Sequence, residues 1–400
     1  MELEKYDFLI VGAGIFGATV AERLASEGKK VLVIDRRDHI AGNIFSYTDS
    51  ATGIEIHKYG SHIFHTENEE VWNYITRFTE FNGYVHTVPT RHNGEFFPMP
   101  VNLDTINKLY EKDMTAEEAE AFVNAEAEKA VAEICAHKGI EIADFNPDNF
   151  SEQGRSLVGD KLYEAFLKNY TEKQWNTNAE NISADILKRI PVRFSKDNRY
   201  FMNAKYQGIP KDGYTKIVEK MLANDNIDIK LETDFNSLKY DIPAHITVVY
   251  CGQIDQLLDY EFGVLPYRSL RFESEMIDEN DDSEISKDSK YGYAVINEAD
   301  AEVAYTRTHF YKYYQIHQPE VINQSMSFIC REYPNDYTKG EEAYYPVNNP
   351  QSQELYQRYV DRLKEIHPNI ILGGRLGAYQ YWDMDVAVGY ALKLASQLLS

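Results

Sequence analysis

Apolar and polar residues near the N-terminus follow a pattern that predicts two buried strands joined by a helix. Residues 8–11 and 31–34 are short apolar runs, and residues 15–26 repeat apolar side chains at helical spacing. Short apolar runs bounded by turns are typical of strands inside a parallel sheet. Gly28 follows the helical segment in the place of a C-terminal cap. The pattern therefore predicts a strand–helix–strand unit.

Three glycines mark the turn between the first strand and the helix. Gly12, Gly14 and Gly17 have the spacing G-x-G-x-x-G, and Asp35 stands at the end of the second strand. The first glycine permits a tight turn, the second lets a pyrophosphate approach the backbone, and the third lets helix and strand pack closely. The helix N-terminus then offers free N–H groups to a phosphate. We interpret the segment as a dinucleotide site; a glycine-rich turn in an ordinary βαβ unit is the alternative.

The residues after the second strand bear on which dinucleotide binds. Asp35 can accept hydrogen bonds from a ribose diol and argues against a 2′-phosphate, which favours NAD or FAD over NADP. Arg36 and Arg37 could instead indicate NADP, although paired basic residues are usually solvated. Residues 41–43, Ala-Gly-Asn, resemble the second glycine motif of FAD enzymes.

Further along the chain, periodicity predicts a nucleotide domain that is interrupted by insertions. Helices are predicted over residues 68–81, 105–138, 151–175, 214–222 and 387–399. Strands are predicted over residues 87–100, 199–206 and 227–231, at Phe235, and over residues 247–250, 291–314, 325–333 and 370–374. Residues 115–118, TAEE, fit a helix N-cap, and the acidic residues 273–290 predict an exposed, mobile loop. The late strand and the last helix suggest that the chain end completes the nucleotide domain.

The net charge limits the partners that the chain can bind. A formal charge of −23 over 400 residues argues against nucleic acid and anionic membrane. An anionic substrate would therefore need a local basic pocket. Lys188, Arg189 and Arg193 in the segment 183–194 are the candidates, and a solvated basic face is the alternative.

Cysteine usage and the distribution of apolar residues predict the compartment. Cys135, Cys251 and Cys330 are odd in number and far apart, so no disulfide framework or metal spacing is visible and we expect a reducing compartment. The acidic N-terminus carries no signal peptide, and no apolar stretch approaches the length of a membrane span. We therefore expect a cytoplasmic protein without membrane insertion.

Several histidines and aromatic residues are candidates for a site, each with a plainer interpretation. His62 and His65 are a weak metal pair because no Cys or acid completes a ligand set, and structural or cofactor-facing roles stay open. Phe166 and Tyr170 share one helix face, where core packing is the alternative. No Ser/His/Asp or Cys/His arrangement stands out, so the demanding chemistry falls to a cofactor.

Taken together, these motifs identify a family resemblance that covers essentially the whole chain. In order, they are GAGIFGA, DRRDHIAGN, YGSHIFHT, YTEKQW, LKRIPVRF, YQGIP, GYT, YRSL, YTR, YYPVN and GRLGAYQYWDMD. The chain resembles the bacterial UDP-galactopyranose mutases, flavoenzymes that interconvert UDP-galactopyranose and UDP-galactofuranose. Single motifs such as the glycine turn are common, but the combination is highly specific.

This resemblance implies an α/β fold with three domains. The FAD-binding Rossmann-type domain would be discontinuous, over residues 1–85, 206–262 and 346–400. A helical substrate domain with a mobile loop would cover residues 100–190. An antiparallel sheet domain would comprise residues 86–99, 191–205 and 263–345. The family also implies a homodimer.

The resemblance also assigns residues to the site. The implied catalytic residues are His65, Arg189 and Arg307, and no metal ligand is implied. The implied FAD-binding residues are Gly12, Gly14, Ile15, Phe16, Gly17, Asp35, Arg36, Gly42, Asn43, Tyr59, Gly60, His62, Arg375, Asp383 and Met384. The implied UDP-galactose-binding residues are His86, Phe166, Tyr170, Thr171, Trp175, Arg189, Tyr200, Arg268, Asn297, Arg307, Tyr345 and Tyr381.

Four positions depart from the family pattern. Ser61 and Ala41 replace a frequent Pro and Gly, Asn176 replaces a frequent Gly, and His86 stands where Asn is expected. None of these changes removes a charged anchor. His86 and Ser61 bear on sugar specificity, because both positions are expected near the hexose.

The implied mechanism needs reduced FAD and no net redox change. Flavin N5 would attack the anomeric carbon, UDP would leave, and the opened sugar would close through another hydroxyl. Two alternatives use the same motifs differently. A redox flavoenzyme of the amine-oxidase type would consume oxygen or NADH, and a non-catalytic FAD- or nucleotide-sugar-binding protein would bind without turnover.

Overall fold

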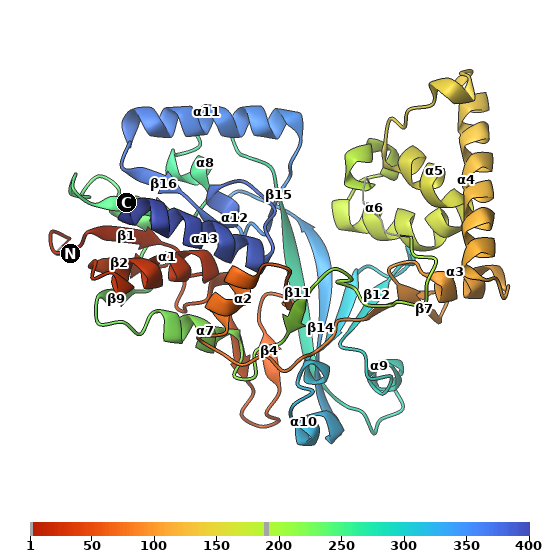
Figure 1. Ribbon diagram of the computed structural model, residues 1–400, viewed down its shortest axis with the longest axis horizontal. Helices are drawn as coiled ribbons and strands as arrows, with labels where there is room; N and C mark the ends of the chain where they lie inside the picture. The colour runs from red at the N-terminus through yellow and green to blue at the C-terminus, as the bar shows by residue number, and fades with distance from the viewer. Residues whose placement is uncertain (1–2, 188–191) are drawn as a thin grey trace.

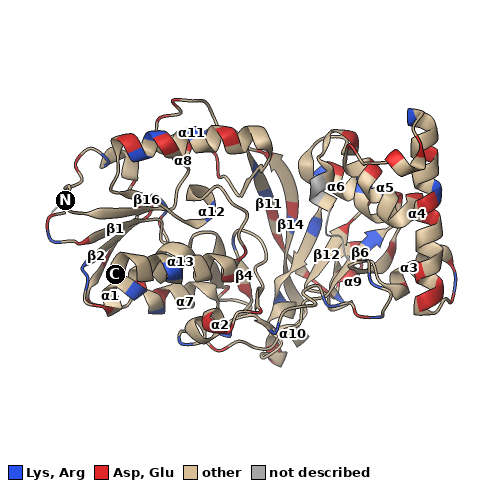
Figure 2. Cartoon of the chain, turned by 45° about the horizontal axis from the view of Figure 1, so that its top comes forward, with Lys and Arg blue, Asp and Glu red and all other residues tan. Residues whose placement is uncertain are grey.

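A parallel sheet covered by helices forms one side of the molecule, and an antiparallel sheet joins it to a lobe made of helices (Figure 1). The computed structural model describes residues 3–187 and 192–400. Lys188 and Arg189, which the sequence offers as an anion site, lie outside the described residues. Acidic and basic side chains are interspersed along the helices of both sides (Figure 2).

The parallel sheet has the strand order β16-β10-β1-β2-β9. The strands are β1 (Phe8–Val11), β2 (Val31–Ile34), β9 (Ile227–Lys230), β10 (Thr247–Tyr250) and β16 (Ile370–Leu372). Ile10 of β1 belongs to the core cluster on one face, and its neighbour Leu9 belongs to the cluster on the other. Because both faces are covered, the central strands are apolar without alternation, as the sequence predicts.

Helices from both ends of the chain cover this sheet. On one face α1 (Ile15–Ser26) packs against α13 (Met384–Leu399), the last helix. On the other face lie α8 (Ile254–Leu257) and α11 (Pro350–Ile366), whose Tyr359 and Leu363 are buried. Strand β16, close to the C-terminus, pairs with β10. The final fifty residues therefore belong to the same sheet as β1 and to the helices that cover this sheet.

The second sheet has seven strands in the order β15-β11-β14-β13-β12-β6-β7. They are β6 (Val88–His92), β7 (Glu95–Met99), β11 (Tyr267–Asp278), β12 (Val295–Glu298), β13 (Arg307–Phe310), β14 (Met326–Asp336) and β15 (Tyr345–Pro346). Every neighbouring pair is antiparallel except β6 and β12. The antiparallel strands expected over 291–314 and 325–333 are shorter or shifted in the structure, but they are present.

The expectation of a mobile acidic loop over residues 273–290 is wrong. Residues 273–278 continue β11, which pairs with β14 along its whole length, and α9 (Glu284–Ser289) follows. The acidic side chains find partners across the sheet: Arg331 Nη1 lies 2.7 Å from Glu275 Oε1, and Lys312 Nζ lies 2.8 Å from Glu279 Oε1. Composition was misleading because these partners come from distant parts of the chain.

The helical lobe is built from α3 (Leu103–Tyr110), α4 (Ala116–Lys138), α5 (Phe150–Leu162) and α6 (Asn169–Trp175). The predicted cap is present: Thr115 and Glu118 form a reciprocal capping box at the start of α4. The single helix predicted over 151–175 is interrupted. Gly159 has φ +75° inside α5, and the π-helical segment Tyr163–Lys168 separates α5 from α6. The interruption sets the direction in which α6 approaches the antiparallel sheet.

Shorter elements lie around and between the two sheets. They are β3 (Ser46–Thr48), β4 (Glu55–His57), β5 (Phe64–Thr66), α2 (Glu69–Ile75), β8 (Tyr206–Gly208), α7 (Tyr214–Met221), α10 (Pro319–Asn323) and α12 (Gly374–Gly377). The strand predicted over residues 199–206 is wrong except at its last residue. The chain turns there, and Phe201 stacks on His65 with 3.7 Å between ring centroids. Phe235, also predicted as a strand residue, starts a single 3₁₀ turn because the Asp234 side chain accepts a bond from Asn236 N.

Two helical glycines of the α1–α13 layer provide a test of the close packing. A Cβ added at Gly17 would lie 2.0 Å from the Gly12 carbonyl oxygen, whereas one added at Gly389 would lie 3.5 Å from Val71. We expect Gly17→Ala to lower the free energy of unfolding by about 1–3 kcal/mol or more. Gly389→Ala should raise it by up to about 1 kcal/mol through helix propensity. Urea denaturation measures both, and equal stability of the two variants would contradict the packing argument.

Candidate active site

A pocket opens at the carboxyl ends of β1, β2 and β10, where the glycine turns lie. Its unfilled space, part of it open to solvent, is about 1300 Å³. Most of the residues assigned to the cofactor line it: Gly12, Gly14, Ile15, Phe16, Gly17, Asp35, Arg36, Gly42, Asn43, His62, Arg375, Asp383 and Met384. Tyr59 and Gly60 lie outside this lining. The carboxyl edge of a parallel sheet is the usual place for a nucleotide.

The two glycine turns pack against each other and leave backbone facing the pocket. Gly12 has φ +112°, and its N–H donates to Ile34 O at 2.8 Å. Gly14 pairs with Ala41 in an isolated bridge, and a Cβ on Gly42 would lie 3.0 Å from Gly14 Cα. Gly14 is also the N-cap of α1 and makes no side-chain cap, so the first N–H groups of α1 are left without a side-chain acceptor.

The Asp35 carboxylate is fixed at the rim of this pocket. Its Oδ2 accepts a hydrogen bond from Ala13 N at 2.8 Å and its Oδ1 accepts one from Arg37 N at 2.9 Å. Each carboxylate oxygen keeps a second lone pair for a ribose hydroxyl. Arg36 and Arg37 both form ion pairs with Glu342, at 3.0 and 2.8 Å. Because the Glu342 carboxylate compensates the positive charge of these arginines, they attract the 2′-phosphate of NADP less than the sequence alone suggests.

A second helix N-terminus also faces the pocket. Asp383 is the N-cap of α13 without a side-chain cap of its own, and Met384 begins the helix. Arg375 is held nearby, since its Nη2 donates to Trp382 O at 2.6 Å. Its guanidinium carbon lies 5.1 Å from the ring centroids of both Tyr345 and Tyr381, which stack on each other at 5.3 Å. Arg375 from the C-terminal motif thus lines the pocket, and Tyr345 and Tyr381 stack beside its guanidinium.

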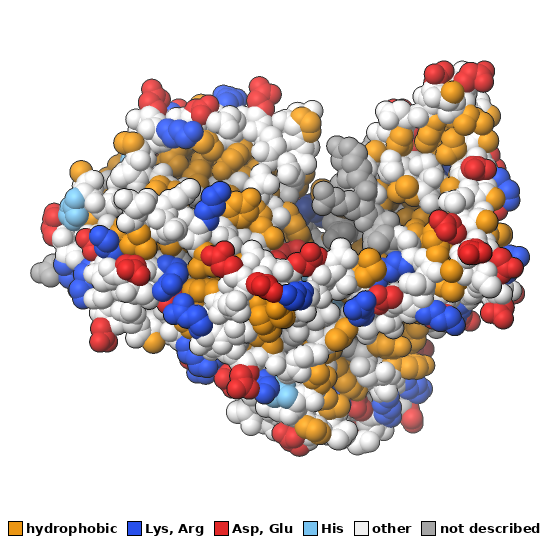
Figure 3. Space-filling model, viewed as in Figure 1, with side chains coloured by type: hydrophobic (Ala, Val, Ile, Leu, Met, Phe, Trp, Pro, Cys, Tyr) orange, Lys and Arg blue, Asp and Glu red, His pale blue; other side chains and the backbone are white. Residues whose placement is uncertain are grey.

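A second hollow adjoins the first, because Asp383 lines both. It is bordered by His65, Arg193 and Tyr200. His65 Nε2 lies 3.9 Å from Asp383 Oδ2. Of the two histidines that the sequence singles out, His62 therefore faces the dinucleotide pocket and His65 faces the adjoining hollow. In the space-filling view, the surface is also hollowed between the helical lobe and the rest of the molecule (Figure 3).

Arg307 on β13 meets Tyr170 on α6 where the helical lobe approaches the antiparallel sheet. Arg307 Nε donates to Tyr170 Oη at 2.9 Å. Arg307 Nη1 lies 3.7 Å from Glu332 Oε1 on the neighbouring strand β14, where the two residues are register partners. The structure thus brings together two residues, 137 positions apart, that the resemblance assigns to the substrate.

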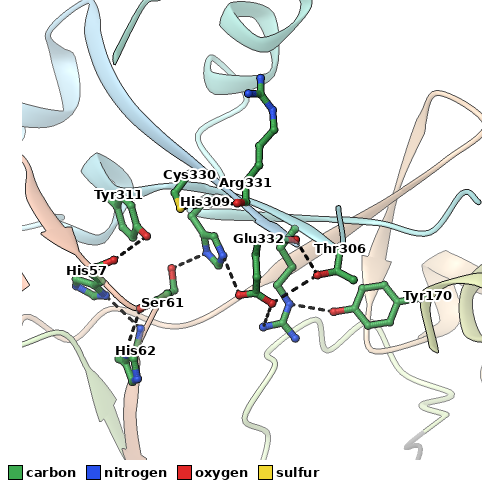
Figure 4. A network of polar contacts seen from close by, with 12 residues as sticks. His57, Ser61, His62, Tyr170, Thr306, His309, Tyr311, Cys330, Arg331 and Glu332 are labelled. Carbon is green, nitrogen blue, oxygen red and sulfur yellow. Dashed lines mark hydrogen bonds and ion pairs between the residues drawn. The ribbon is translucent and has the colours of Figure 1, made fainter. Parts of the chain in front are cut away.

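Glu332 is the centre of a buried polar network that sequence reasoning missed (Figure 4). His309 Nε2 lies 3.3 Å from Glu332 Oε2, and Thr306 Oγ1 donates to the Glu332 carbonyl oxygen at 3.1 Å. Burial alone would raise the pKa of Glu332, but the Arg307 charge and the His309 hydrogen bond lower it to about 2. The sequence gives little signal for this role, because Glu332 follows Arg331 in a strand that mixes apolar and polar residues.

Lys173 and Arg268 fasten α6 to the antiparallel sheet. Lys173 Nζ donates to four carbonyl oxygens of the segment 298–305, at 2.8 to 3.3 Å from Glu298, Asp300, Val303 and Tyr305. Arg268 pairs with Asp336 and donates to Gln174 O at 3.0 Å. These contacts fix Tyr170 and Trp175 relative to Arg307. Arg268, which the resemblance assigns to the substrate, makes a contact between elements here.

The remaining predicted substrate residues lie at different depths. His86 is buried, and burial followed by the nearby Arg307 charge lowers its pKa to about 3, so its imidazole is neutral at pH 7. Phe166 lies in the core of the helical lobe, 5.0 Å from Phe97 between ring centroids, which agrees with the plainer interpretation of core packing. Thr171 is buried, and Trp175 is half-buried at the edge of the same core. Asn297 pairs with Arg307 across β12 and β13.

Cys251 is the cysteine in the lining of the dinucleotide pocket. Burial raises the pKa of its thiol to about 12, so the sulfur is protonated at neutral pH and a poor nucleophile. Within residues 3–187 and 192–400, no group of three or more His, Cys, Asp or Glu side chains could hold a metal ion. No helix in the described part of the chain is long and apolar enough to cross a membrane.

The fold and the pocket define a dinucleotide-binding protein of the Rossmann type, in which an inserted helical lobe and antiparallel sheet carry an arginine–tyrosine site. A family model for the NAD(P)-binding Rossmann-like domain matches residues 10–78, and one for UDP-galactopyranose mutase matches residues 165–381. The chain belongs to the UDP-galactopyranose mutase family. The family predicted from the sequence motifs is thereby confirmed.

Similar proteins agree with this assignment along the whole chain. A probable UDP-galactopyranose mutase of Klebsiella pneumoniae is 39% identical over 402 residues, covering 100% of this chain and 96% of that protein. A dTDP-fucopyranose mutase of Escherichia coli is 36% identical over 396 residues and covers 97% of both. A crystal structure of reduced UDP-galactopyranose mutase shares the fold, with a TM-score of 0.71 over 98% of this chain and 95% of the other at 13% identity.

The buried Glu332 carboxylate predicts a specific dependence of stability on pH. Its folded-state pKa of about 2 lies below the ordinary value of 4.5, so its contribution is present above pH 4.5 and is lost as the pH falls toward 2. We expect Glu332→Gln to lower the free energy of unfolding by up to about 3 kcal/mol at pH 7. The difference from the unsubstituted protein should shrink between pH 4.5 and pH 2.

Denaturant titrations over this pH range provide the measurement. Glu275→Gln is the matched control, because Glu275 on β11 pairs with Arg331 on β14 in a more exposed ion pair of the same sheet. That variant should change stability by less than about 1 kcal/mol at any pH. A pH-independent loss in Glu332→Gln would show that the carboxylate is not ionised in the folded protein.

Proposed function

We propose that the chain interconverts UDP-galactopyranose and UDP-galactofuranose with FAD held in the dinucleotide pocket. The observation that carries the proposal is the pairing of Arg307 with Tyr170 beside that pocket. A nucleoside diphosphate needs a cation for its phosphates and a flat apolar surface for its base. Arg307 supplies the first, and Tyr170 and Trp175 at the edge of the helical lobe supply the second.

The residues of the pocket fit FAD. Gly12, Gly14 and Gly42 leave room for a pyrophosphate against the backbone, and the N-termini of α1 and α13 both face the space. Asp35 is placed for a ribose, and Glu342 compensates the two arginines that would otherwise favour NADP. When bound in reduced form, FAD would supply flavin N5 as the nucleophile toward the anomeric carbon, through a covalent N5–sugar intermediate without net redox change.

The side chains around the pocket would bind and orient the substrate. Arg307 would hold the diphosphate, with Arg189, which lies outside the described residues, as its proposed partner. Tyr345 and Tyr381 stack beside Arg375 and would line the sugar side of the cofactor pocket. His65 is proposed to help set the position or charge of the flavin from the adjoining hollow. Because the Cys251 thiol is neutral, a nucleophile supplied by the cofactor is favoured.

Two features of the proposal concern the whole assembly and the substrate. A homodimer and a cytoplasmic location remain predictions from the sequence.

The relatives at 39% and 36% identity are named for different nucleotide sugars, so the assay should compare both. The two named nucleotide sugars differ in the base, in the 2′-hydroxyl of the nucleoside pentose and at carbon 6 of the hexose, whereas the diphosphate that Arg307 would hold is common to both.

Product analysis tests the proposed reaction. We expect the purified protein to release FAD on denaturation and to convert UDP-galactopyranose to the furanose, by NMR, only after reduction with dithionite. No oxygen or NADH should be consumed per turnover, and cyanoborohydride during turnover should leave a hexose on the flavin by mass spectrometry. dTDP-fucopyranose serves as the comparison substrate. Stoichiometric NADH or oxygen consumption would favour a redox flavoenzyme, and tight binding without turnover would favour a binding protein.

Substitution of Arg307 tests the substrate site. Arg307→Ala should lower kcat/KM by the equivalent of about 2–5 kcal/mol, because a desolvated charge pair with the diphosphate is lost. FAD content should stay unchanged, since Arg307 does not line the dinucleotide pocket. Arg331→Ala is the matched control: Arg331 lies one strand away, and its side chain points away from the network (Figure 4). Unchanged kcat/KM in Arg307→Ala would remove the assignment.

A further inference from the structure

Ser61 and His309 form a contact that the proposed reaction does not use. Ser61 Oγ lies 2.6 Å from His309 Nδ1, although the two residues are 248 positions apart. Only 1% of the His309 side chain is exposed, and its other nitrogen, Nε2, lies 3.3 Å from Glu332 Oε2. Both ring nitrogens therefore have partners.

The hydrogen-bond chemistry decides which nitrogen carries the proton. Glu332 is ionised and can only accept, so His309 Nε2 must donate. In the neutral imidazole Nδ1 is then an acceptor, and Ser61 Oγ–H donates to it. Glu332 thus sets the tautomer, and the Ser61 hydroxyl, which can donate or accept, provides the partner that the other ring nitrogen needs. A Pro or Ala at position 61 would leave a buried ring nitrogen without this partner.

These contacts form a continuous chain from the cofactor pocket to the helical lobe. Ser61 precedes His62, which lines the dinucleotide pocket. From Ser61 the chain runs through His309 to Glu332, then to Arg307 at 3.7 Å, and on to Tyr170 at 2.9 Å. Figure 4 shows Ser61, His309 and Glu332 pointing toward one another from the segment before β5, from β13 and from β14. Neither Ser61 nor His309 needs to touch the substrate to affect Arg307.

We propose that Ser61 and His309 are positioning residues that hold Glu332, and through it the Arg307 guanidinium, in the orientation that receives the substrate diphosphate. The proposal rests on the proposed function for the role of Arg307. With Oε2 of Glu332 engaged by His309, Oε1 is left to face Arg307 Nη1. This arrangement keeps Arg307 Nε on Tyr170 and directs the remaining N–H groups of the guanidinium toward the site. Without His309, the carboxylate is free to rotate and to compete with the diphosphate for Arg307.

UDP affinity of the oxidised FAD-loaded protein, measured by calorimetry, tests the proposal without requiring turnover. We expect Ser61→Ala and His309→Leu each to weaken UDP binding by about fivefold to tenfold. An effect of this size is within the range of interaction free energies found between contacting residues. Ser61→Thr, which keeps a hydroxyl, and His309→Gln, which keeps an N–H donor, should recover most of the affinity. FAD content and thermal unfolding of the Ser61 variants should remain close to those of the unsubstituted protein.

A double-mutant cycle separates positioning from general damage. If Ser61 acts only through His309, Ser61→Ala should have no further effect on UDP affinity in the His309→Leu background. Additive losses, or equal affinities of Ser61→Ala and Ser61→Thr, would overturn the proposal. The Ser61 pair keeps the test valid even if His309→Leu fails to fold.

Arg307→Ala serves as the reference in the same titrations. If it leaves UDP affinity unchanged, the proposed substrate site fails and the positioning proposal fails with it. If it weakens UDP binding while Ser61→Ala does not, the substrate site stands and only the positioning proposal is overturned.

Discussion

The close approach of α1 to the turn after β1 is the constraint on which the nucleotide pocket depends. No side chain fits at Gly17, because a Cβ there would lie 2.0 Å from the Gly12 carbonyl oxygen. This contact places the open N-terminus of α1 directly at the end of the central strand. The second glycine turn then packs on the first through Gly14 and Gly42. Backbone, rather than side chains, therefore forms this part of the pocket, which suits a pyrophosphate.

Buried charge imposes the second constraint. Glu332 and Arg307 lie side by side on neighbouring strands, in a protein whose net charge is −23. Burying a carboxylate is unfavourable unless charge and hydrogen bonds compensate it. Here the Arg307 charge, the His309 contact and a long hydrogen bond of 3.5 Å from Thr306 Oγ1 to Glu332 Oε1 do so together. The network therefore does more than stabilise its own surroundings. It holds the Arg307 cation in a fixed place where the antiparallel sheet meets the helical lobe.

The position of the helical lobe depends on a small number of polar contacts. Lys173 bonds to four carbonyl oxygens of the segment that leads into β13, and Arg268 reaches the end of α6 from β11. Both contacts keep Tyr170 within reach of Arg307. The site therefore lies at a junction of three parts of the chain, and its geometry follows from how they are joined.

The sequence by itself determined what local pattern can specify. The glycine spacing, the apolar runs 8–11 and 31–34, and the capping box at Thr115 each involve residues close together in the chain, so the βαβ unit and the start of α4 could be predicted. The ordered motifs determined the family. Most of the residues that the motifs assigned to the cofactor line the dinucleotide pocket, because they cluster mainly in two glycine turns and one C-terminal motif.

Only the tertiary structure decided the features that join distant segments. It showed residues 273–278 as a paired strand, because the compensating Arg331 comes from another part of the chain. It placed His62 in the dinucleotide pocket and His65 in the adjoining hollow, which no spacing distinguishes. It revealed Glu332 and His309, whose roles arise from contacts across strands and, for Ser61 and His309, across 248 positions. Hydrogen bonds of this kind leave no periodic signal, so a single sequence does not encode them in a readable form.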